Sequence, residues 1–353
     1  MLGGFRSKSL IFADFLTQSL SKFKMAKSNK SGGFLSGFFS KAFTASAIGA
    51  IAYGVYTYYP DLWQKFFGDT KPDVELPTDP EPVKPKPTDP EPSDPTRDVR
   101  LANYLPSVTG ANQVVKHTYY TLSYANAYEQ SEWIAYELTK TRVTKGAEER
   151  GNNFRSDASV KLGSATPDDY KSTGYDRGHL APAKDMSFEA TAMSESFFMS
   201  NMSPQEPGFN RGIWKELEEQ VRDYAVQCDH IYVVTGPILP ANIVKRIGKN
   251  KVAVPKSYYK VLLDMTGSSH KGIAFILPNE DSDKHLKDYV VTIDDVEKKT
   301  GLNFFPTLSK TDEAKLEAKS DITQWGVNDE RAQKRIMEVK MRLAKGIKLS
   351  SEL

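Results

Sequence analysis

The chain has 353 residues, which is enough for one large domain or two ordinary ones with a buried core. With 39% hydrophobic and 26% charged residues, its composition is globular and excludes a fibrous protein. A formal net charge of +2 excludes a bulk polycation, so any footprint for an anionic partner must be a local patch.

The N-terminal part of the chain predicts a membrane anchor. Residues 1–41 form a basic segment with seven Lys or Arg against one Asp, and residues 42–59 contain no charge. At 1.5 Å per residue, an 18-residue helix spans about 27 Å, close to a bilayer core. Lysines before it and tyrosines at its far end predict a transmembrane segment with the C-terminal bulk translocated. The alternative is a buried Ala/Gly helix, but a long linker follows and could not cover it.

The linker is residues 71–98, which hold nine of the chain's 20 prolines and two copies of TDPEP. A segment with so few apolar groups cannot offset its ordering entropy by burial. We expect a semi-rigid, polyproline-biased spacer that holds the globular part away from the anchor.

Residues 99–308 have the pattern of an α+β domain. Short β-type runs separated by Gly, Pro and Asn turns dominate it, with helical patterns at 210–227 and 293–300. The single cysteine, Cys228, lies in an apolar stretch and predicts a buried, inert thiol. Residues 309–353 are charged and favour helix, so we expect a charged helical tail that is a surface helix or partly disordered.

Three short blocks in this domain carry residues suited to chemistry. They read YDRGHLAPA (175–183), SNMSPQ (200–205) and FNRGIWKELE (209–218). Each block also has an ordinary structural interpretation when taken singly. A lone histidine is usually a hydrogen-bonded structural residue, a DRG triplet is usually a turn, and an Asn before a helical pattern is usually an N-cap.

Taken together, in this order and spacing, the blocks resemble the DNA/RNA non-specific endonuclease family, whose pattern is DRGH, then N-x-x-P-Q, then N-x-x-x-W-x-x-L-E. Similarity continues through 234–237, 254–260 and 296–301, so it covers most of residues 100–308. The resemblance implies a ββα-metal (His-Me finger) fold with a central antiparallel sheet and flanking helices. It also implies a Mg²⁺-dependent endonuclease for DNA and RNA, with Mn²⁺ as a substitute ion.

The residue types fit phosphodiester hydrolysis. Water must be deprotonated, and an imidazole with a pKa near 6.5 makes His179 a suitable general base at pH 7. Arg177 would share a face with it on an extended strand and could clamp phosphate oxygens. By the resemblance, Asn210 is the protein ligand of Mg²⁺, a hard ion that tolerates few protein ligands. Glu218, two helical turns on and about 80° around the axis, would hold metal-bound water; its alternative is a solvated glutamate.

Other polar residues have weaker assignments. Asn201 could orient the His179 ring through its side chain or backbone, or serve a turn beside Pro204. Asp176 is interpreted as structural, fixing Arg177 or the loop. The family uses an upstream arginine to bind phosphate, and Arg150 and Arg155 compete for that role. The remaining histidines have no supporting motif and are expected to be structural or on the surface: His117, His230, His270 and His285.

These observations predict a membrane-tethered nuclease that cleaves DNA and RNA with little sequence preference, because nothing resembles a groove-reading element. The alternatives are a phosphodiesterase acting on another substrate at the cell envelope and a non-catalytic nucleic-acid-binding module. The translocated side is expected to be the bacterial periplasm or exterior, with the mitochondrial intermembrane space as the alternative. A protein inhibitor or a homodimer is compatible with the resemblance.

Overall fold

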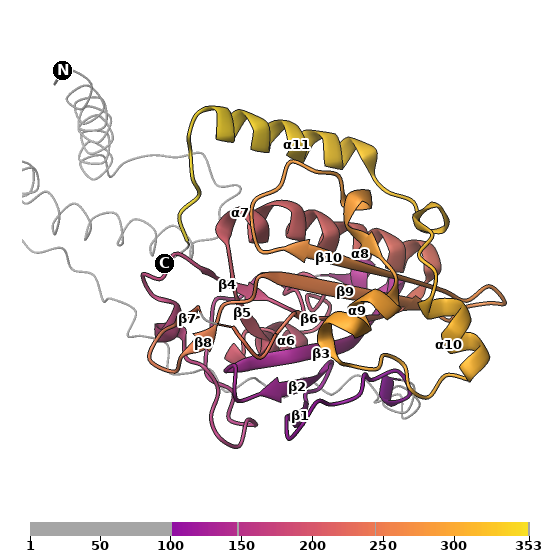
Figure 1. Cartoon of the computed structure of the whole chain (residues 1–353), viewed down its shortest axis with the longest axis horizontal. Coiled ribbons are helices and arrows are strands. Elements are labelled where there is room, and N and C mark those ends of the chain that lie inside the picture. Colours follow the sequence, from indigo (N-terminus) through magenta and orange to yellow (C-terminus); the bar gives the residue numbers. More distant parts are fainter. Residues whose placement is uncertain (1–100, 147, 244, 352–353) are drawn as a thin grey trace, which may run out of the picture. The chain divides into compact units, whose positions relative to one another are not determined.

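A seven-stranded antiparallel sheet forms the centre of the domain in the computed structural model, which describes residues 101–146, 148–243 and 245–351 (Figure 1). Every neighbouring pair in the sheet runs antiparallel. In spatial order the strands are β1 (Gln113–Lys116), β2 (Thr121–Ala125), β3 (Gln130–Thr139), β6 (His230–Pro237), β9 (Ser257–Asp264), β10 (Lys271–Pro278) and β11 (Val290–Val291). The expected α+β organisation with a central antiparallel sheet is confirmed.

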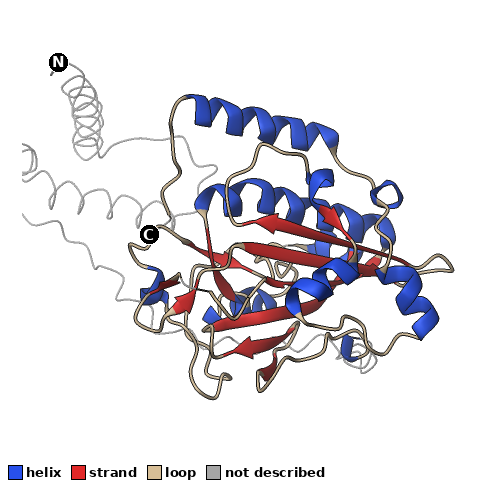
Figure 2. Cartoon of the chain, in the orientation of Figure 1, coloured by secondary structure: helices blue, strands red, loops and turns tan. Residues whose placement is uncertain are grey.

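Helices cover both faces of the sheet (Figure 2). Because strand side chains alternate between faces, Leu262 of β9 joins the core under helix α8 (Lys215–Cys228), while its neighbours Val261 and Leu263 join the opposite core. That opposite core includes residues of helix α9 (Ile293–Thr300). The result is a three-layer helix–sheet–helix arrangement.

Helix α9 shows how local sequence sets these boundaries. Thr292 and Asp295 form a capping box at its start. Gly301 ends the helix with φ +74°, a left-handed conformation in which a glycine has no Cβ penalty.

A second, two-stranded sheet lies outside the central one and carries the DRGH block. Strand β4 (Asp176–His179) pairs antiparallel with β5 (Met202–Gln205), so that His179 stands opposite Met202. Gly178 is required there because a Cβ at this position would overlap the side chain of Gln205. From β5 the chain enters α7 (Pro207–Phe209), a π-helical turn η3 (Asn210–Trp214) and then α8. Two strands and a helix therefore bring the three sequence blocks together.

The remaining elements are short and lie between or beside these units. They are α5 (Lys140–Lys145), η1 (Pro167–Tyr170), α6 (Ala190–Glu195), η2 (Met199–Asn201), β7 (Arg246–Ile247), β8 (Val252–Ala253), η4 (Leu286–Tyr289), α10 (Lys310–Glu317), η5 (Ile322–Gln324) and α11 (Asp329–Ala344). Cys228 is a buried free thiol at the end of α8, and burial raises its pKa to about 11, as expected for an inert group.

The C-terminal segment contains helices α10 and α11, in keeping with the expected charged helical tail, and a few buried side chains anchor it to the domain. Trp325 is only 2% exposed and packs in the core beside Tyr224 of α8. Arg335 of α11 is buried, where it pairs with Glu216 of α8 and donates to the carbonyl of Ser282. Sequence hydropathy did not indicate these anchors because they are few and mixed: the Trp325 ring, the Arg335 ion pair, and the small set of buried apolar residues Leu316, Ala332 and Val339.

No helix in the described part of the chain is long and apolar enough to span a membrane. The segments predicted as a basic N-terminus, an anchor and a Pro-rich linker, residues 1–41, 42–59 and 71–98, lie outside the described residues.

The buried pair between α11 and α8 yields a stability prediction. Arg335→Ala should lower the free energy of unfolding by roughly 3–5 kcal/mol, because Glu216 would become an unpaired buried charge. Arg331 on the same helix pairs with Glu219 and Asp223 at the surface, so Arg331→Ala should cost less than about 1 kcal/mol. Urea unfolding curves of the two variants measure the difference. Equal losses would show that the buried pair does not hold the tail.

Candidate active site

Two of the three sequence blocks, 175–183 and 209–218, line one cleft with a volume of about 950 Å³, and the third, 200–205, contributes no lining residue. His179 and Arg177 enter it from β4, Asn210 from η3 and Glu218 from the first turns of α8. Its full lining is Arg150, Gly151, Asn152, Phe154, Asp176, Arg177, His179, Pro182, Ala183, Lys184, Asn210, Arg211, Lys215, Glu218, Glu219 and Arg222.

His179 lies against aromatic rings and is held in its neutral form. Its ring centroid is 5.0 Å from that of Phe197 and 5.6 Å from that of Phe154. Its Nε2 atom is buried and has no hydrogen-bond partner among the described residues. Burial, with further contributions from Arg150 and Arg177, lowers the pKa of His179 to about 3. The imidazole is therefore unprotonated, and able to accept a proton, throughout the neutral range.

Asn210 is oriented by a carboxylate from the neighbouring strand. Its Nδ2 donates to Oδ2 of Asp176 at 2.9 Å, and the guanidinium of Arg211 grips the same carboxylate at 2.7 and 3.0 Å. Since a carboxylate can only accept, this bond fixes which end of the amide is nitrogen and leaves the oxygen as the free acceptor. Asp176 thus fixes the Asn210 turn, a structural role that the sequence blocks alone did not indicate.

The turn that carries Asn210 is not a regular helix start. Gly212 has φ −103° and ψ −111°, which breaks the helical path within η3. Asn210 itself has helical angles and its side chain bonds to Asp176, so the N-cap interpretation does not apply. The angle of about 80° between Asn210 and Glu218 assumed one continuous α-helix and is wrong for the same reason. A π-helical turn in a helix is often found at functional sites.

Glu218 interacts electrostatically with a buried lysine, Lys260, that no sequence motif indicated. Lys260 of β9 is 1% exposed, its Nζ has no hydrogen-bond partner among the described residues, and it lies 4.8 Å from the centre of the Trp214 ring. Burial raises the pKa of Glu218, against the opposing charge of Lys260, and burial lowers the pKa of Lys260. In the sequence, Lys260 could have been recognised as unusual because it lies between apolar residues in the middle of β9.

A second charged group supports the same wall of the cleft. Asp185 accepts from Arg222 at 2.8 Å and from the hydroxyl of Tyr136 at 2.8 Å. Both Asp185 and Arg222 act electrostatically on Glu218, the first raising its pKa and the second lowering it. Arg222 lies four residues after Glu218 on α8, whereas Asp185 and Tyr136 come from distant parts of the chain and no local pattern indicated them.

The two upstream arginines differ in position. Arg150 is exposed, lines the cleft and acts on the pKa of His179. Arg155 does not line the cleft. Its guanidinium donates to the carbonyl and hydroxyl of Ser194 in α6 and lies 4.0 Å from the ring centre of Phe198. Of the two candidates, only Arg150 is placed to meet a substrate phosphate, and the expectation for Arg155 is corrected.

Asn201 is also outside the cleft lining, and its contacts miss the His179 ring. Its side chain accepts from the amide of Ala181 at 2.8 Å and donates to the carbonyls of Ala181 and Ser196 at 2.9 and 2.7 Å. Its backbone carbonyl accepts from Leu180. Asn201 therefore fixes the turn that follows His179, which corrects the expectation that it orients the imidazole.

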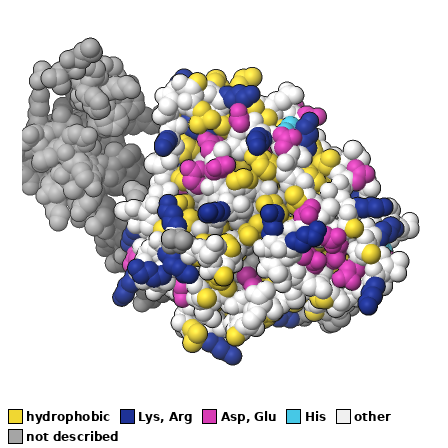
Figure 3. Space-filling model, in the orientation of Figure 1, with side chains coloured by type: hydrophobic (Ala, Val, Ile, Leu, Met, Phe, Trp, Pro, Cys, Tyr) yellow, Lys and Arg dark blue, Asp and Glu magenta, His cyan; other side chains and the backbone are white. Residues whose placement is uncertain are grey.

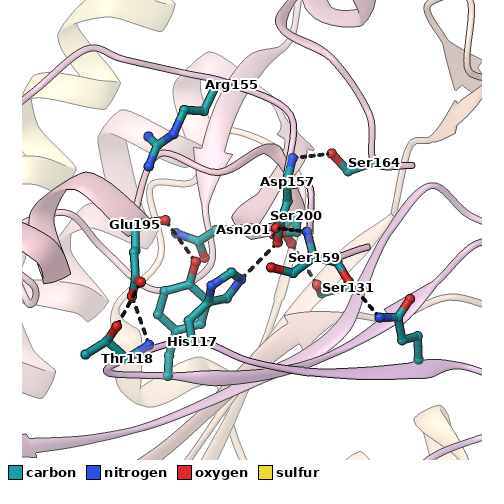
Figure 4. Close-up of polar contacts among 12 residues, drawn as sticks. His117, Thr118, Ser131, Arg155, Asp157, Ser159, Ser164, Glu195, Ser200 and Asn201 are labelled. Atoms are coloured by element: carbon teal, nitrogen blue, oxygen red, sulfur yellow. Dashed lines mark hydrogen bonds and ion pairs between the residues drawn. The ribbon is translucent and has the colours of Figure 1, made fainter. Parts of the chain in front are cut away.

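The network around Asn201 is structural (Figure 4). Nε2 of His117 lies 2.9 Å from Oδ2 of Asp157, and the hydroxyl of Ser200 donates to the same oxygen at 2.6 Å. Because the serine donates to the aspartate and not to the histidine, this trio lacks the arrangement of a hydrolytic triad. It holds the segment before β5 in place.

The cleft is basic although the chain is nearly neutral. Its lining includes six Lys or Arg against three Asp or Glu, an excess of three positive charges. Arg211 and Arg222 are engaged with Asp176 and Asp185. The others include Arg150 and Arg177, which lie beside His179, and Arg177 is 4.1 Å from the centre of the Phe154 ring. With a net charge of only +2, a footprint for an anionic partner had to be a local patch, and this cleft is such a patch.

The donor set at this position suits a hard divalent cation. An amide oxygen fixed by a buried carboxylate and a nearby glutamate are oxygen ligands of the kind Mg²⁺ accepts, and the cleft is large enough to keep its water shell. No described residue here offers a thiolate or a second imidazole, which disfavours Zn²⁺.

Two antiparallel strands followed by a helix, with a histidine on the first strand and an asparagine at the helix start, define a ββα-metal domain. Residues 100–311 match the family model described as DNA/RNA non-specific endonuclease. The chain therefore belongs to the DNA/RNA non-specific endonuclease family, as the sequence motifs indicated.

Relatives agree with this assignment. The chain is 35% identical over 217 residues to "Nuclease EXOG, mitochondrial" of Xenopus laevis, covering 57% of this chain and 60% of that protein. It is 34% identical to "Endonuclease G, mitochondrial" of Homo sapiens, covering 59% and 74%, and 34% identical to "Nuclease" of Nostoc sp., covering 61% and 81%. The chain thus spans about three fifths of the length of the EXOG protein.

A solved structure shares the fold. A chain in "Crystal structure of the EndoG/EndoGI complex: Mechanism of EndoG inhibition" superposes with a TM-score of 0.57 at 31% identity, covering 65% of this chain and 97% of that chain. The predicted ββα-metal fold is confirmed.

The contrast between the two arginines can be tested. Arg150→Ala should raise KM roughly ten- to a hundredfold through loss of a charge-assisted phosphate contact. It should also raise the pKa of His179, because a cation that opposes protonation is gone. The neutral base would then be lost at a higher pH, so the acid limb of kcat/KM should move upward.

Arg155→Ala is the matched control. It should leave KM and the acid limb near those of the parent, since its guanidinium is engaged with Ser194 and does not line the cleft. A pH series of initial rates for both variants checks this. A larger KM effect from Arg155→Ala would reverse the assignment.

Proposed function

We propose that this chain is a Mg²⁺-dependent, sugar-non-specific endonuclease that hydrolyses phosphodiester bonds in DNA and RNA. The observation that carries the proposal is the gathering of His179, Arg177, Asn210 and Glu218 in one basic cleft of a ββα-metal domain. Mn²⁺ is expected to substitute, because it also takes oxygen ligands.

His179 acts as the general base that deprotonates the attacking water. In the free protein its lowered pKa makes it a weak base, but Arg150 and Arg177 are among the causes of that lowering. A bound phosphodiester would neutralise both guanidinium groups, so the pKa of His179 would rise toward the range in which a base is most effective. Substrate binding thereby strengthens the base that acts on it.

Arg177 and Arg150 hold the phosphate and offset the charge that grows on it in the transition state. The ring of Phe154 supports the Arg177 guanidinium from one side, which limits its freedom before substrate arrives. Asn210 would hold Mg²⁺ directly, and Glu218 would hold it through water. The bound ion supplies charge stabilisation for the departing 3′ oxygen, and the products carry 5′-phosphate ends. None of these contacts selects a base, so we expect little sequence preference.

The proposal is tested by digesting plasmid DNA and an unrelated RNA with the full chain, in Mg²⁺ and in EDTA. Cleavage of both polymers only with the metal supports it. Binding without cleavage would indicate a nucleic-acid-binding module. Inertness toward both polymers together with hydrolysis of a small phosphodiester would indicate another substrate.

The roles of base and metal ligand are separable. His179→Ala should lower the rate by about 10² to 10⁴ while Mg²⁺ and DNA still bind. Asn210→Ala should weaken Mg²⁺ binding, so excess metal should partly restore its rate. Higher pH should help the His179 variant more, because hydroxide replaces a missing base but not a missing ligand. A grid of rates over Mg²⁺ concentration and pH measures this. Rescue of His179→Ala, but not of Asn210→Ala, by metal would reverse the roles.

We further propose that residues 1–98 place the nuclease at a membrane and take no part in catalysis. The proposal rests on the uncharged run 42–59 and the Pro-rich run 71–98. The EXOG and endonuclease G relatives are named as mitochondrial, so the intermembrane space stands beside the bacterial envelope as a location. A chain starting at Val99 should be active and leave the membrane fraction. Continued sedimentation with membranes would refute the anchor.

A protein inhibitor that covers the cleft would compete with DNA for binding.

A further inference from the structure

Three carboxylates converge on the face of the sheet opposite α8, away from the nuclease cleft. Asp294 and Glu297 come from α9, and Glu317 is the last residue of α10. One oxygen from each lies within 4.8 Å of the others. Acidic side chains gather over α9 and the neighbouring end of α10 in the space-filling view (Figure 3).

Packing against the sheet fixes this convergence. Ile293 and Leu316, which flank the acidic residues, are buried in the core on this face. Both press on Gly272 of β10, where an added Cβ would lie 3.0 Å from the Ile293 side chain and 3.0 Å from the Leu316 carbonyl. The backbones that carry the carboxylates are therefore packed closely against the sheet.

Glu317 is an independent sign of a missing partner. Its residue is 2% exposed, and its Oε1 is buried without a hydrogen-bond partner among the described residues. Leaving a buried carboxylate unpaired is costly, and the C-terminal end of a helix adds unfavourable negative potential. Burial, then Glu297, Glu313 and Asp294, raise the pKa of Glu317 to about 8, with no basic group among these causes.

The neighbouring polar groups do not compensate Glu317. Oε1 of Glu297 accepts from the amide of Phe304 at 2.7 Å, which leaves its second oxygen for another partner. Lys298 on α9 lies 3.7 Å from Asp295 at the surface, and both side chains are exposed. The cluster thus presents several acceptor oxygens with no cation paired to it among the described residues.

We propose that Asp294, Glu297 and Glu317 bind a divalent cation, with Ca²⁺ the best match, at the junction of α9 and α10. The ligands are carboxylate oxygens only, as hard cations prefer, and water can complete the shell because two of the three residues are partly exposed. Ca²⁺ tolerates the irregular geometry that three side chains from two helices impose, whereas Mg²⁺ demands a near-ideal octahedron. The bound ion would tie the C-terminal segment to the nuclease domain.

Calorimetric titration of the full chain with Ca²⁺ tests the site. Asn210→Ala is used as the background, so that the proposed catalytic ligand does not contribute to uptake. This chain should bind one Ca²⁺, and Ca²⁺ should raise its Tm. Adding Glu317→Gln should weaken Ca²⁺ binding by roughly tenfold or more, because a charged ligand is lost, and should remove the rise in Tm. Glu338→Gln on the exposed side of α11 makes the same charge change and should alter neither.

Asp294→Asn is the second variant in case Glu317→Gln does not fold, because Asp294 is partly exposed in the first turn of α9. It should weaken Ca²⁺ binding in the same direction. No Ca²⁺ uptake by the Asn210→Ala chain would overturn the proposal. So would unchanged affinity in the acidic-cluster variants. So would an Asn210→Ala chain whose Tm does not respond to Ca²⁺ while Glu317→Gln raises that Tm, since Glu317 would then carry a proton instead of an ion.

Discussion

The carboxylate of Asp176 is the contact on which the geometry of the cleft depends. It sits at the start of β4, three residues before His179, and it holds both Asn210 and Arg211 at the start of the helix. The histidine-bearing strand and the asparagine-bearing turn are therefore joined by one buried, charge-assisted group. Its 3% exposure keeps water from competing for these bonds. The proposed base and the proposed metal ligand are thus fixed relative to each other before substrate arrives.

Electrostatics within the cleft follow from burial as much as from charge count. His179 and Lys260 are both driven toward their neutral forms by burial, and Glu218 is driven the same way. Each of these groups would regain charge or basicity when an oppositely charged ligand enters. A polyanionic substrate and a divalent cation are the two ligands that would do so here. Burial disfavours the charged forms of these groups, and binding of an oppositely charged ligand would offset that cost.

The C-terminal segment extends this organisation beyond the family region, which ends at residue 311. Arg342 of α11 pairs with Asp281, and Asp281 packs directly on Gly208 and lies near Gly212, on either side of Asn210. Arg335 pairs with Glu216 on the helix that carries Glu218. Two ion pairs thus connect the tail to the elements that position the proposed metal ligands. The tail is part of the frame of the cleft, although it contributes no residue to its lining.

The sequence by itself determined the family, the strand-rich α+β order and the identity of His179, Arg177, Asn210 and Glu218 as candidates. These features are local, because side-chain periodicity and motif spacing depend on residues that lie close together in the sequence. Tertiary structure alone showed that Arg150 and not Arg155 lines the cleft and that Asn201 contacts the turn after His179 instead of the imidazole. It also revealed the buried Lys260, which interacts electrostatically with Glu218. It also showed that Trp325 and Arg335 anchor the tail to the domain, while most of α11 lies at the surface. Each of these outcomes depends on contacts between residues far apart in the chain, and no local pattern specifies which distant partner will exclude water from a given side chain.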